Sequence, residues 1–196
     1  GTDRTQEELL AKIDEKIKER SLLKHPFYKD WQMGCLTIPM LQIYAKQYYK
    51  HVAAFPQYLS AVHSKIDDTN DRKIILKNLM DEENGQKNHP ELWLRFGEAL
   101  GLPREEIRKA IPFNETNDFV NHFKSVTCNN SVAEGVAALY AYESQIPKVS
   151  EEKINGLKTF YGITEESGLE YFKVHMEADI EHSRDELELI KKYAPD

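Results

Sequence analysis

The sequence predicts an all-α protein, on two observations. Apolar residues recur at spacings of three and four through almost the whole chain, and the alternation typical of half-buried strands is nearly absent. With 196 residues the chain is long enough to bury a substantial core. No repeat, low-complexity tract or long linker divides it, so we expect one domain spanning residues 1–196.

Seven or eight helices are expected, with a short segment over residues 25–34 between the first two. The predicted ranges are 5–23, 37–64, 71–88, 90–100, 117–127, 131–146, 151–161 and 165–193.

The boundaries rest on capping and breaking residues. Thr5 opens a capping box that ends at Glu8, and Thr37 precedes a proline in the first turn of the next helix. Pro56 predicts a kink inside that helix, and Gly101 ends the one that follows Pro90.

Composition narrows the function classes. The chain carries 26 basic and 33 acidic residues, a net charge of −7, and no basic tract, so we expect neither nucleic-acid nor membrane partners. No apolar run approaches the roughly 20 residues that cross a bilayer, and the polar N-terminus does not have the pattern of a signal peptide. Two cysteines, Cys35 and Cys128, fit a reducing compartment, so a cytoplasmic location is expected.

The last predicted helix carries a stripe of metal-binding residue types. His175, Asp179 and His182 stand at i, i+4 and i+7, which places them on one narrow face at about 100° per residue. Phe172 and Leu189 continue the same face, so it is expected to point into the core. Imidazoles and a carboxylate on a buried face form half of a site for a first-row transition metal.

A second pair of candidate ligands lies on the helix predicted over residues 71–88. Glu82 and His89 continue an aliphatic stripe, whereas Glu83 lies about 100° away and is the weaker candidate. Seven residues of regular helix span roughly 10.5 Å, which is long for two ligands of one ion. Either the helix unwinds near Gly85 or the two residues bind different ions.

Glu143 supplies a third carboxylate from another apolar stripe. Bundle cores that hold two iron or two manganese ions are built from this kind of inventory. One buried histidine is more often a satisfied core group, but six candidates on three apolar stripes indicate a metal site. The six are Glu82, His89, Glu143, His175, Asp179 and His182.

The remaining polar residues carry weaker signals. The other histidines, at 25, 51, 63 and 122, are expected to be structural or exposed, and the Glu-rich face after Asp185 to be a solvated surface. Tyr142 adjoins Glu143, and Tyr28 is expected in a break between helices. Lys153 is expected at the start of a helix, where its charge opposes the macrodipole. From the residues alone, each of these three is more simply structural.

Four further segments are distinctive: His25-Pro-Phe-Tyr-Lys-Asp-Trp31, Tyr44-Ala-Lys-Gln-Tyr-Tyr49, Asn78-Leu-Met-Asp-Glu-Glu-Asn-Gly85 and Gly135-Val-Ala-Ala-Leu-Tyr-Ala-Tyr-Glu-Ser-Gln-Ile-Pro147. With the six candidate ligands, they resemble the haem-oxygenase-like diiron oxidase and oxygenase superfamily, which includes the TenA-like and PqqC-like proteins. Within it, the chain closely resembles the branch of chlamydial proteins associating with death domains. The resemblance covers about residues 21–193 and implies a haem-oxygenase-like bundle with a dimetal site in its core.

That branch implies an unusual activity, the synthesis of p-aminobenzoate for folate from the protein's own side chains. The matching positions are Tyr28 for the ring and Lys153 for the amino group, with Tyr44 and Tyr142 lining the site. The resemblance also implies two transition-metal ions (Fe/Fe or Fe/Mn), O₂, an external reductant, a single turnover and a homodimer. A death-domain partner is doubtful here, because the chain ends at Asp196 and the chlamydial relatives continue.

Three alternatives stay open at this point. A conventional dimetal oxygenase would act on an external small molecule at the same site. A thiamin-degrading relative would need a nucleophilic cysteine, but neither Cys35 nor Cys128 lies in a distinctive segment. A non-enzymatic interaction module, of the death-domain type, would leave the six buried ligands without a purpose.

Overall fold

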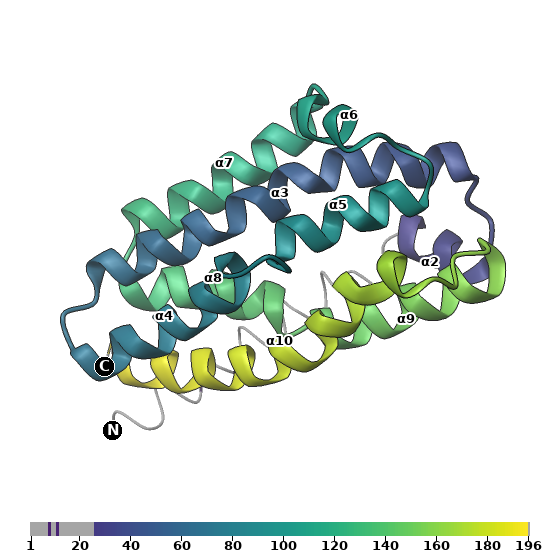
Figure 1. Cartoon of the computed structure of the whole chain (residues 1–196). Coiled ribbons are helices and arrows are strands. Elements are labelled where there is room, and N and C mark those ends of the chain that lie inside the picture. The colour runs from purple at the N-terminus through teal and green to yellow at the C-terminus, as the bar shows by residue number, and fades with distance from the viewer. Residues whose placement is uncertain (1–7, 9–10, 12–25, 196) are drawn as a thin grey trace.

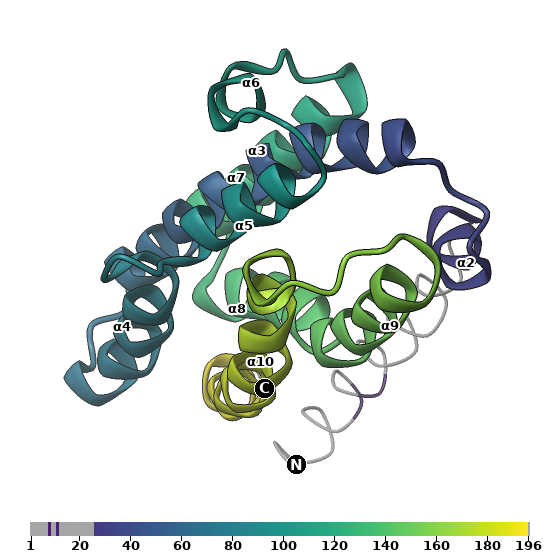
Figure 2. The same cartoon turned by 45° about the vertical axis from the view of Figure 1, so that its right-hand side comes forward.

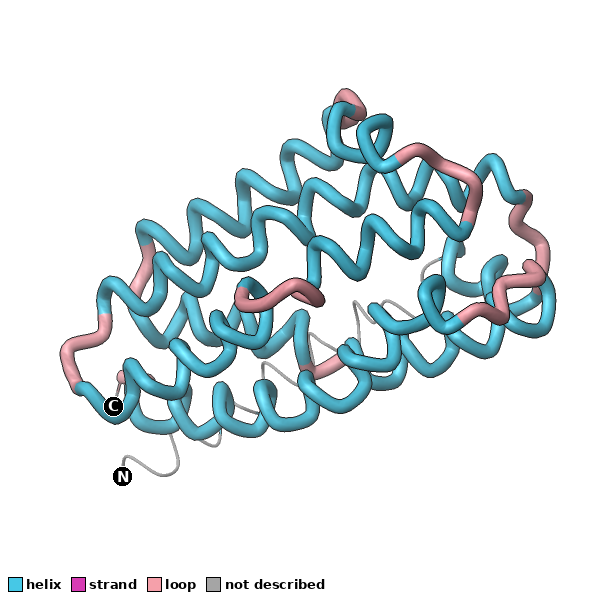
Figure 3. Tube along the Cα trace, viewed as in Figure 1, coloured by secondary structure: helices cyan, strands magenta, loops and turns pink. Residues whose placement is uncertain are grey.

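Helices make up most of the part of the chain that the computed structural model describes, residues 8, 11 and 26–195 (Figures 1 and 3). No strand occurs among these residues, which confirms the predicted all-α class. The helix predicted over residues 5–23 lies outside the described residues. The helices are α2 (Pro26–Met33), α3 (Ile38–Lys65), α4 (Thr69–Glu83), α5 (His89–Ala99), α6 (Arg104–Lys109), α7 (Asn114–Asn129), α8 (Val132–Glu143), α9 (Ile146–Phe160) and α10 (Glu166–Tyr193).

Two long helices organise the bundle. Helix α3 packs against α7, α4 and α5, and α10 packs against α8, α9 and α5 (Figures 1 and 2). Thr37 caps α3 as predicted, accepting a hydrogen bond from the backbone N–H of Met40, and Pro56 lies inside the helix. No helix in the described part of the chain combines the length and the apolar character needed to cross a membrane.

The predicted helix over residues 71–88 is wrong at its C-terminal end. Helix α4 stops at Glu83, and the chain turns at Gly85, whose φ of 83° lies in the left-handed region that favours glycine. Asn88 then caps α5, its side chain accepting a hydrogen bond of 3.0 Å from the N–H of Glu91. His89 is therefore the first residue of a new helix.

Other boundaries also differ from the prediction. The short helix α6 was not predicted, and α9 begins at Ile146 and not at residue 151. Pro147 sits in the first turn of α9, where its missing N–H leaves no hydrogen bond unmade. Lys153 is consequently inside α9, so the macrodipole argument for it is wrong. Tyr28 lies within α2 and not in a break between helices.

The core consists of two apolar clusters with a polar layer between them. Trp93 and Phe172 belong to one cluster, and Phe55 and Leu189 belong to the other. Both Phe172 and Leu189 are on α10, and the buried residues between them on that helix include His175, Asp179 and His182. The apolar clusters keep water from both sides of this layer, which strengthens electrostatic interactions inside it.

Candidate dimetal centre

The first group of candidate ligands comprises Glu82 from α4, His89 from α5 and His175 from α10. All three side chains are buried, and one donor atom of each lies within 4.8 Å of the others. His89 Nδ1 is 2.7 Å from Glu82 Oε2, and His175 Nε2 is 3.9 Å from Glu82 Oε1. The helix ends before Gly85, and the turn there brings Glu82 and His89 into one group. Of the two alternatives left open by the sequence, unwinding near Gly85 is therefore the one that the structure shows. Glu83 is exposed.

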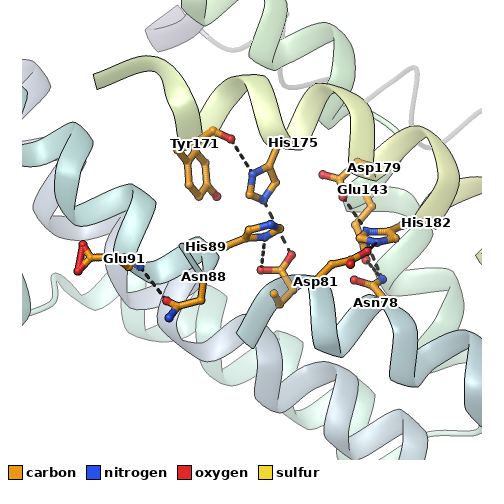
Figure 4. A network of polar contacts seen from close by, with 11 residues as sticks. Asn78, Asp81, Asn88, His89, Glu91, Glu143, Tyr171, His175, Asp179 and His182 are labelled. Carbon is orange, nitrogen blue, oxygen red and sulfur yellow. Dashed lines mark hydrogen bonds and ion pairs between the residues drawn. The ribbon is translucent and has the colours of Figure 1, made fainter. Parts of the chain in front are cut away.

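Tyr171 orients one of these imidazoles. The Nδ1 of His175 lies 2.9 Å from the backbone oxygen of Tyr171, one turn earlier in α10 (Figure 4). A carbonyl oxygen only accepts hydrogen bonds, so Nδ1 carries the proton and Nε2 keeps its lone pair. The Tyr171 ring also stacks on His175 at 4.1 Å between centroids. These two contacts direct Nε2 toward Glu82.

The second group joins Glu143 from α8 to Asp179 and His182 from α10. His182 Nδ1 is 3.1 Å from both Glu143 Oε2 and Asp179 Oδ1. Asn78, on α4, donates its side-chain N–H groups to the two Glu143 oxygens at 3.1 and 3.2 Å (Figure 4). The three donor residues and Asn78 are buried, so the Glu143 carboxylate is held by these side chains away from bulk solvent.

Asp81 contacts His182 and was not among the candidates from the sequence. Its Oδ2 lies 2.7 Å from Nε2 of His182, although Asp81 itself is exposed. Burial lowers the pKa of His182, but the hydrogen bonds that its ring donates to Asp179, Glu143 and Asp81 outweigh burial and raise the pKa to about 11. The three carboxylates therefore favour the positively charged form of the His182 imidazole.

The expectation that the Glu-rich face after Asp185 is solvated is wrong for Glu186. This residue is 1% exposed, and no hydrogen-bond donor of the described residues reaches either of its oxygens. Burial and the nearby Glu143 carboxylate raise the pKa of Glu186 well above its ordinary value. Its position at i+11 from His175 on the buried stripe was the signal in the sequence that could have identified it.

The donor set fits two divalent metal ions. The first group offers one carboxylate and two imidazoles, and the second offers two carboxylates and one imidazole. These are ligands that iron, manganese and zinc accept. Burial raises the pKa of Asp179 well above its ordinary value, and the neighbouring carboxylates Glu143 and Glu82 raise it further. Buried carboxylates this close together need positive charge nearby, which bound cations would supply.

A small cavity lies beside both groups. Its volume is about 10 Å³, room for about one water molecule, and it is lined by Glu82, Glu143, His175 and Asp179 together with His51 and Tyr142. We call it the metal-side cavity. His51, to which the sequence analysis gave no site role, is 2% exposed; its Nδ1 lies 3.2 Å from the Tyr58 hydroxyl, and no described residue hydrogen-bonds its Nε2.

Tyr28, Tyr44 and Lys153 come together at a second polar site. Lys153 Nζ donates to the Tyr44 hydroxyl at 2.6 Å and lies 4.8 Å from the centroid of the Tyr28 ring. The hydroxyl groups of Tyr28 and Tyr44 are hydrogen-bonded to each other. Three helices, α2, α3 and α9, supply these side chains. Tyr142, the fourth residue that the family resemblance implies for this site, lines the metal-side cavity.

Burial sets the protonation of this second site. It lowers the pKa of Lys153 from 10.5 to about 7, so a large fraction of the amine is neutral near neutral pH. It also raises the pKa of Tyr28 to about 12, despite the hydrogen bond from Tyr44. The pair therefore joins a nucleophilic amine to a neutral phenol.

The packing of α9 on α2 holds Lys153 over Tyr28. Trp31 donates its indole N–H to the backbone oxygen of Lys153 at 3.2 Å. Gly156, one turn further along α9, lies against the same indole, where a Cβ atom would be 2.5 Å from Cδ1 of Trp31. The absence of a side chain at Gly156 allows this close approach.

The fold and the two donor groups define a class, the helical-bundle redox proteins with carboxylate–histidine metal sites. The chain belongs to the haem-oxygenase-like family of iron-containing redox enzymes, whose family model matches residues 42–196.

Relatives and solved structures agree with this assignment. The chain is 47% identical over 187 residues to a 4-aminobenzoate synthase of Chlamydia muridarum, covering 95% of this chain and 79% of the relative. It is 43% identical to a 4-aminobenzoate synthase of Nitrosomonas europaea, covering 93% and 78%. A domain of unknown function with a haem-oxygenase-like fold from Shewanella denitrificans superposes with a TM-score of 0.79 at 15% identity, covering 95% and 80%. The predicted fold and family resemblance are thereby confirmed.

Proposed function

We propose that this chain makes p-aminobenzoate, the same compound as 4-aminobenzoate, from its own Tyr28 and Lys153 in a single turnover. The observation that carries the proposal is the 4.8 Å distance between Lys153 Nζ and the centroid of the Tyr28 ring. The names of the Chlamydia and Nitrosomonas relatives support the same product. In the cell, the product would enter folate synthesis.

The atoms of the two side chains account for the product. p-Aminobenzoate has as many carbon atoms as the ring and Cβ of a tyrosine, so Cβ would become the carboxyl carbon when the Cα–Cβ bond breaks. Nitrogen from Lys153 would replace the phenol oxygen as the bond between Cε and Nζ breaks, and Cε would take up that oxygen as a hydroxyl group, an exchange without net oxidation. Breaking the Cα–Cβ bond with oxidation of Cβ to the carboxyl group would consume one O₂, which supplies both carboxyl oxygens and accepts four electrons, and would leave a hydrogen atom on Cα. The external reductant would bring the metal ions to the divalent state.

The two donor groups would hold the metal ions, an Fe/Fe or Fe/Mn pair. Glu82, His89 and His175 would bind one ion, and the group formed by Glu143, Asp179 and His182 the other. When bound, such ions activate O₂ by electron transfer. Tyr142 lines the metal-side cavity and would relay electrons toward Tyr28.

Tyr44 would move protons between the two consumed residues. It accepts a hydrogen bond from Lys153 Nζ and is hydrogen-bonded to Tyr28, so a proton leaving the amine has a path through one hydroxyl. The low pKa of Lys153 means that little energy is needed to present it as a free amine. Trp31 and Phe172 of the apolar cluster pack around the Lys153 amine and shield it from bulk water.

The test is mass spectrometry on protein made with ¹³C-labelled tyrosine and ¹⁵N-labelled lysine, loaded with Fe(II) and Mn(II), and exposed to O₂ and reductant. We expect doubly labelled p-aminobenzoate at no more than one molecule per chain, abolished in Tyr28→Phe and Lys153→Arg. Tyr161→Phe and Lys158→Arg are matched controls that should retain it. Unlabelled product, or none from fully metallated protein, would contradict the proposal.

A second candidate function is a conventional dimetal oxygenation of an external small molecule. The observation that favours it is a cavity of about 330 Å³ that reaches Tyr28 and Tyr142. This function predicts several turnovers per chain and little effect of Tyr28→Phe, so the same experiment separates the two.

A further inference from the structure

A larger cavity adjoins the residues of the proposed reaction. It has a volume of about 330 Å³ and lies between α7 and α8, with Tyr28 and Tyr48 also contributing to its walls. We call it the outer cavity. Tyr28 is buried, whereas Phe119 and His122, on the α7 side, are exposed. The outer cavity therefore connects the Tyr28 site with the surface of the protein.

The two cavities share a wall but differ in what they can contain. Tyr142 lines both, whereas Tyr28 lines only the outer cavity. The metal-side cavity, at about 10 Å³, has room for about one water molecule and cannot hold a benzene ring. An aromatic product released from Tyr28 can be accommodated in the outer cavity without rearrangement of the metal ligands.

The lining of the outer cavity suits a small aromatic carboxylate. Phe119, Phe123 and Tyr48 offer aromatic surfaces on which a flat ring can pack. His122 is a polar residue on the exposed side, and an imidazole N–H can donate a hydrogen bond to a carboxylate. Gln145 also lines the cavity, and its side chain donates to the backbone oxygen of Ala141.

We propose that the outer cavity is the binding and release site for p-aminobenzoate, with the ring among the aromatic side chains and the carboxylate held by His122. This inference rests on the proposed function, because it takes Tyr28 as the source of the ligand. The cavity would hold the product after it separates from the chain and open its way to solvent on the α7 side.

Direct binding is the first test. p-Aminobenzoate is titrated into the Fe(II)-loaded full chain under nitrogen, where no reaction occurs, and binding is measured by equilibrium dialysis. We expect His122→Ala to weaken binding about tenfold, the size of effect expected from one hydrogen bond to a charged group. The methyl ester of p-aminobenzoate has no carboxylate, so it should bind the wild-type chain about as weakly as p-aminobenzoate binds His122→Ala. Ala141→Leu fills the cavity and should weaken the binding of p-aminobenzoate more than His122→Ala does. No binding, or binding unchanged in both variants, would overturn the inference.

Release is the second test. After reaction with O₂ and reductant, free product is measured in a rapid ultrafiltrate and total product after acid denaturation. We expect Ala138→Leu and Ala141→Leu to narrow the way out and so to slow release, although they also weaken binding at equilibrium. The free fraction at early times should fall by a factor of about three, relative to Ala137→Leu on the same helix but outside the lining. Unfolding midpoints of all three variants identify any that misfold, and His122→Ala needs no repacking because the residue is exposed.

The outcomes separate the two proposals. If total product forms but neither the free fraction nor the binding responds to the variants, the release site is wrong and the proposed function stands. If no total product forms and the cavity binds p-aminobenzoate and its methyl ester equally, the cavity is not a product site. That result would favour an external apolar substrate and would contradict both the proposed function and the proposed release site.

Discussion

The Nε2 atom of His182 lies 2.7 Å from Oδ2 of Asp81, so this imidazole is held between carboxylates on both of its nitrogens. Asp81 is on α4 and His182 on α10, and the contact therefore ties two helices together across the second ligand group. A carboxylate on the outer nitrogen of a metal-binding imidazole fixes the ring and increases its basicity.

Replacing Asp81 with asparagine should weaken metal binding at the second group. We expect the dissociation constant of one of the two ions to rise by about ten- to hundredfold, since the ring loses its charged partner. Calorimetric titration of metal-free protein with Mn(II) measures the effect. Glu83→Gln, which removes a charge at an exposed position of the same helix, is the control and should leave both sites unchanged.

The buried amine of Lys153 should give the metal-free protein a distinctive pH dependence. Because burial lowers the pKa of Lys153 from 10.5 to about 7, the unfolded chain binds more protons between these pH values. The contribution of Lys153 to the free energy of unfolding therefore rises as the pH increases from about 7 to 10.5. Below pH 7, the buried lysine destabilises the folded state by roughly 5 kcal/mol.

Lys153→Met should remove this dependence. We expect the variant to be more stable than wild type at pH 7, by an amount that shrinks as the pH approaches 10.5. Urea unfolding at four pH values provides the difference, with the exposed Lys158→Met as the matched control. A difference that does not vary with pH would mean that Lys153 titrates normally.

Gly156→Ala should separate α9 from α2. The added Cβ would meet the Trp31 indole at 2.5 Å, so the helices must move apart at a cost of about 1–3 kcal/mol in the free energy of unfolding. The movement would also carry Lys153 away from Tyr28 and reduce the yield of p-aminobenzoate. Asn155→Ala, at an exposed position of α9, should affect neither stability nor yield by a comparable amount.

Gly85→Ala should act through backbone strain alone. No atom lies within 4 Å of the added Cβ, but the φ of 83° costs an alanine about 1 kcal/mol. Relief of this strain would shift His89 relative to Glu82 and weaken metal binding at the first group. Gly85→Asn tolerates the left-handed region better, and its metal affinity should lie closer to wild type; equal affinities in both variants would contradict the explanation.

Local periodicity was enough to identify the donors on α8 and α10. Glu143, His175, Asp179 and His182 could be assigned to buried stripes, because residues three and four apart lie on one face of a helix whatever packs against it. Glu186 obeyed the same rule and was missed because it stands among other acidic residues. The all-α class followed from the same spacing.

What the sequence determined by itself was therefore local: helix type, buried faces and the residue chemistry on them. The tertiary structure decided which faces meet. It placed Asp81 against His182, 101 positions away, and Lys153 against Tyr44, 109 positions away. It also turned the chain at Gly85 so that Glu82 and His89 share one group. Contacts over such separations depend on how whole helices pack, and the periodicity of a single helix does not contain that information.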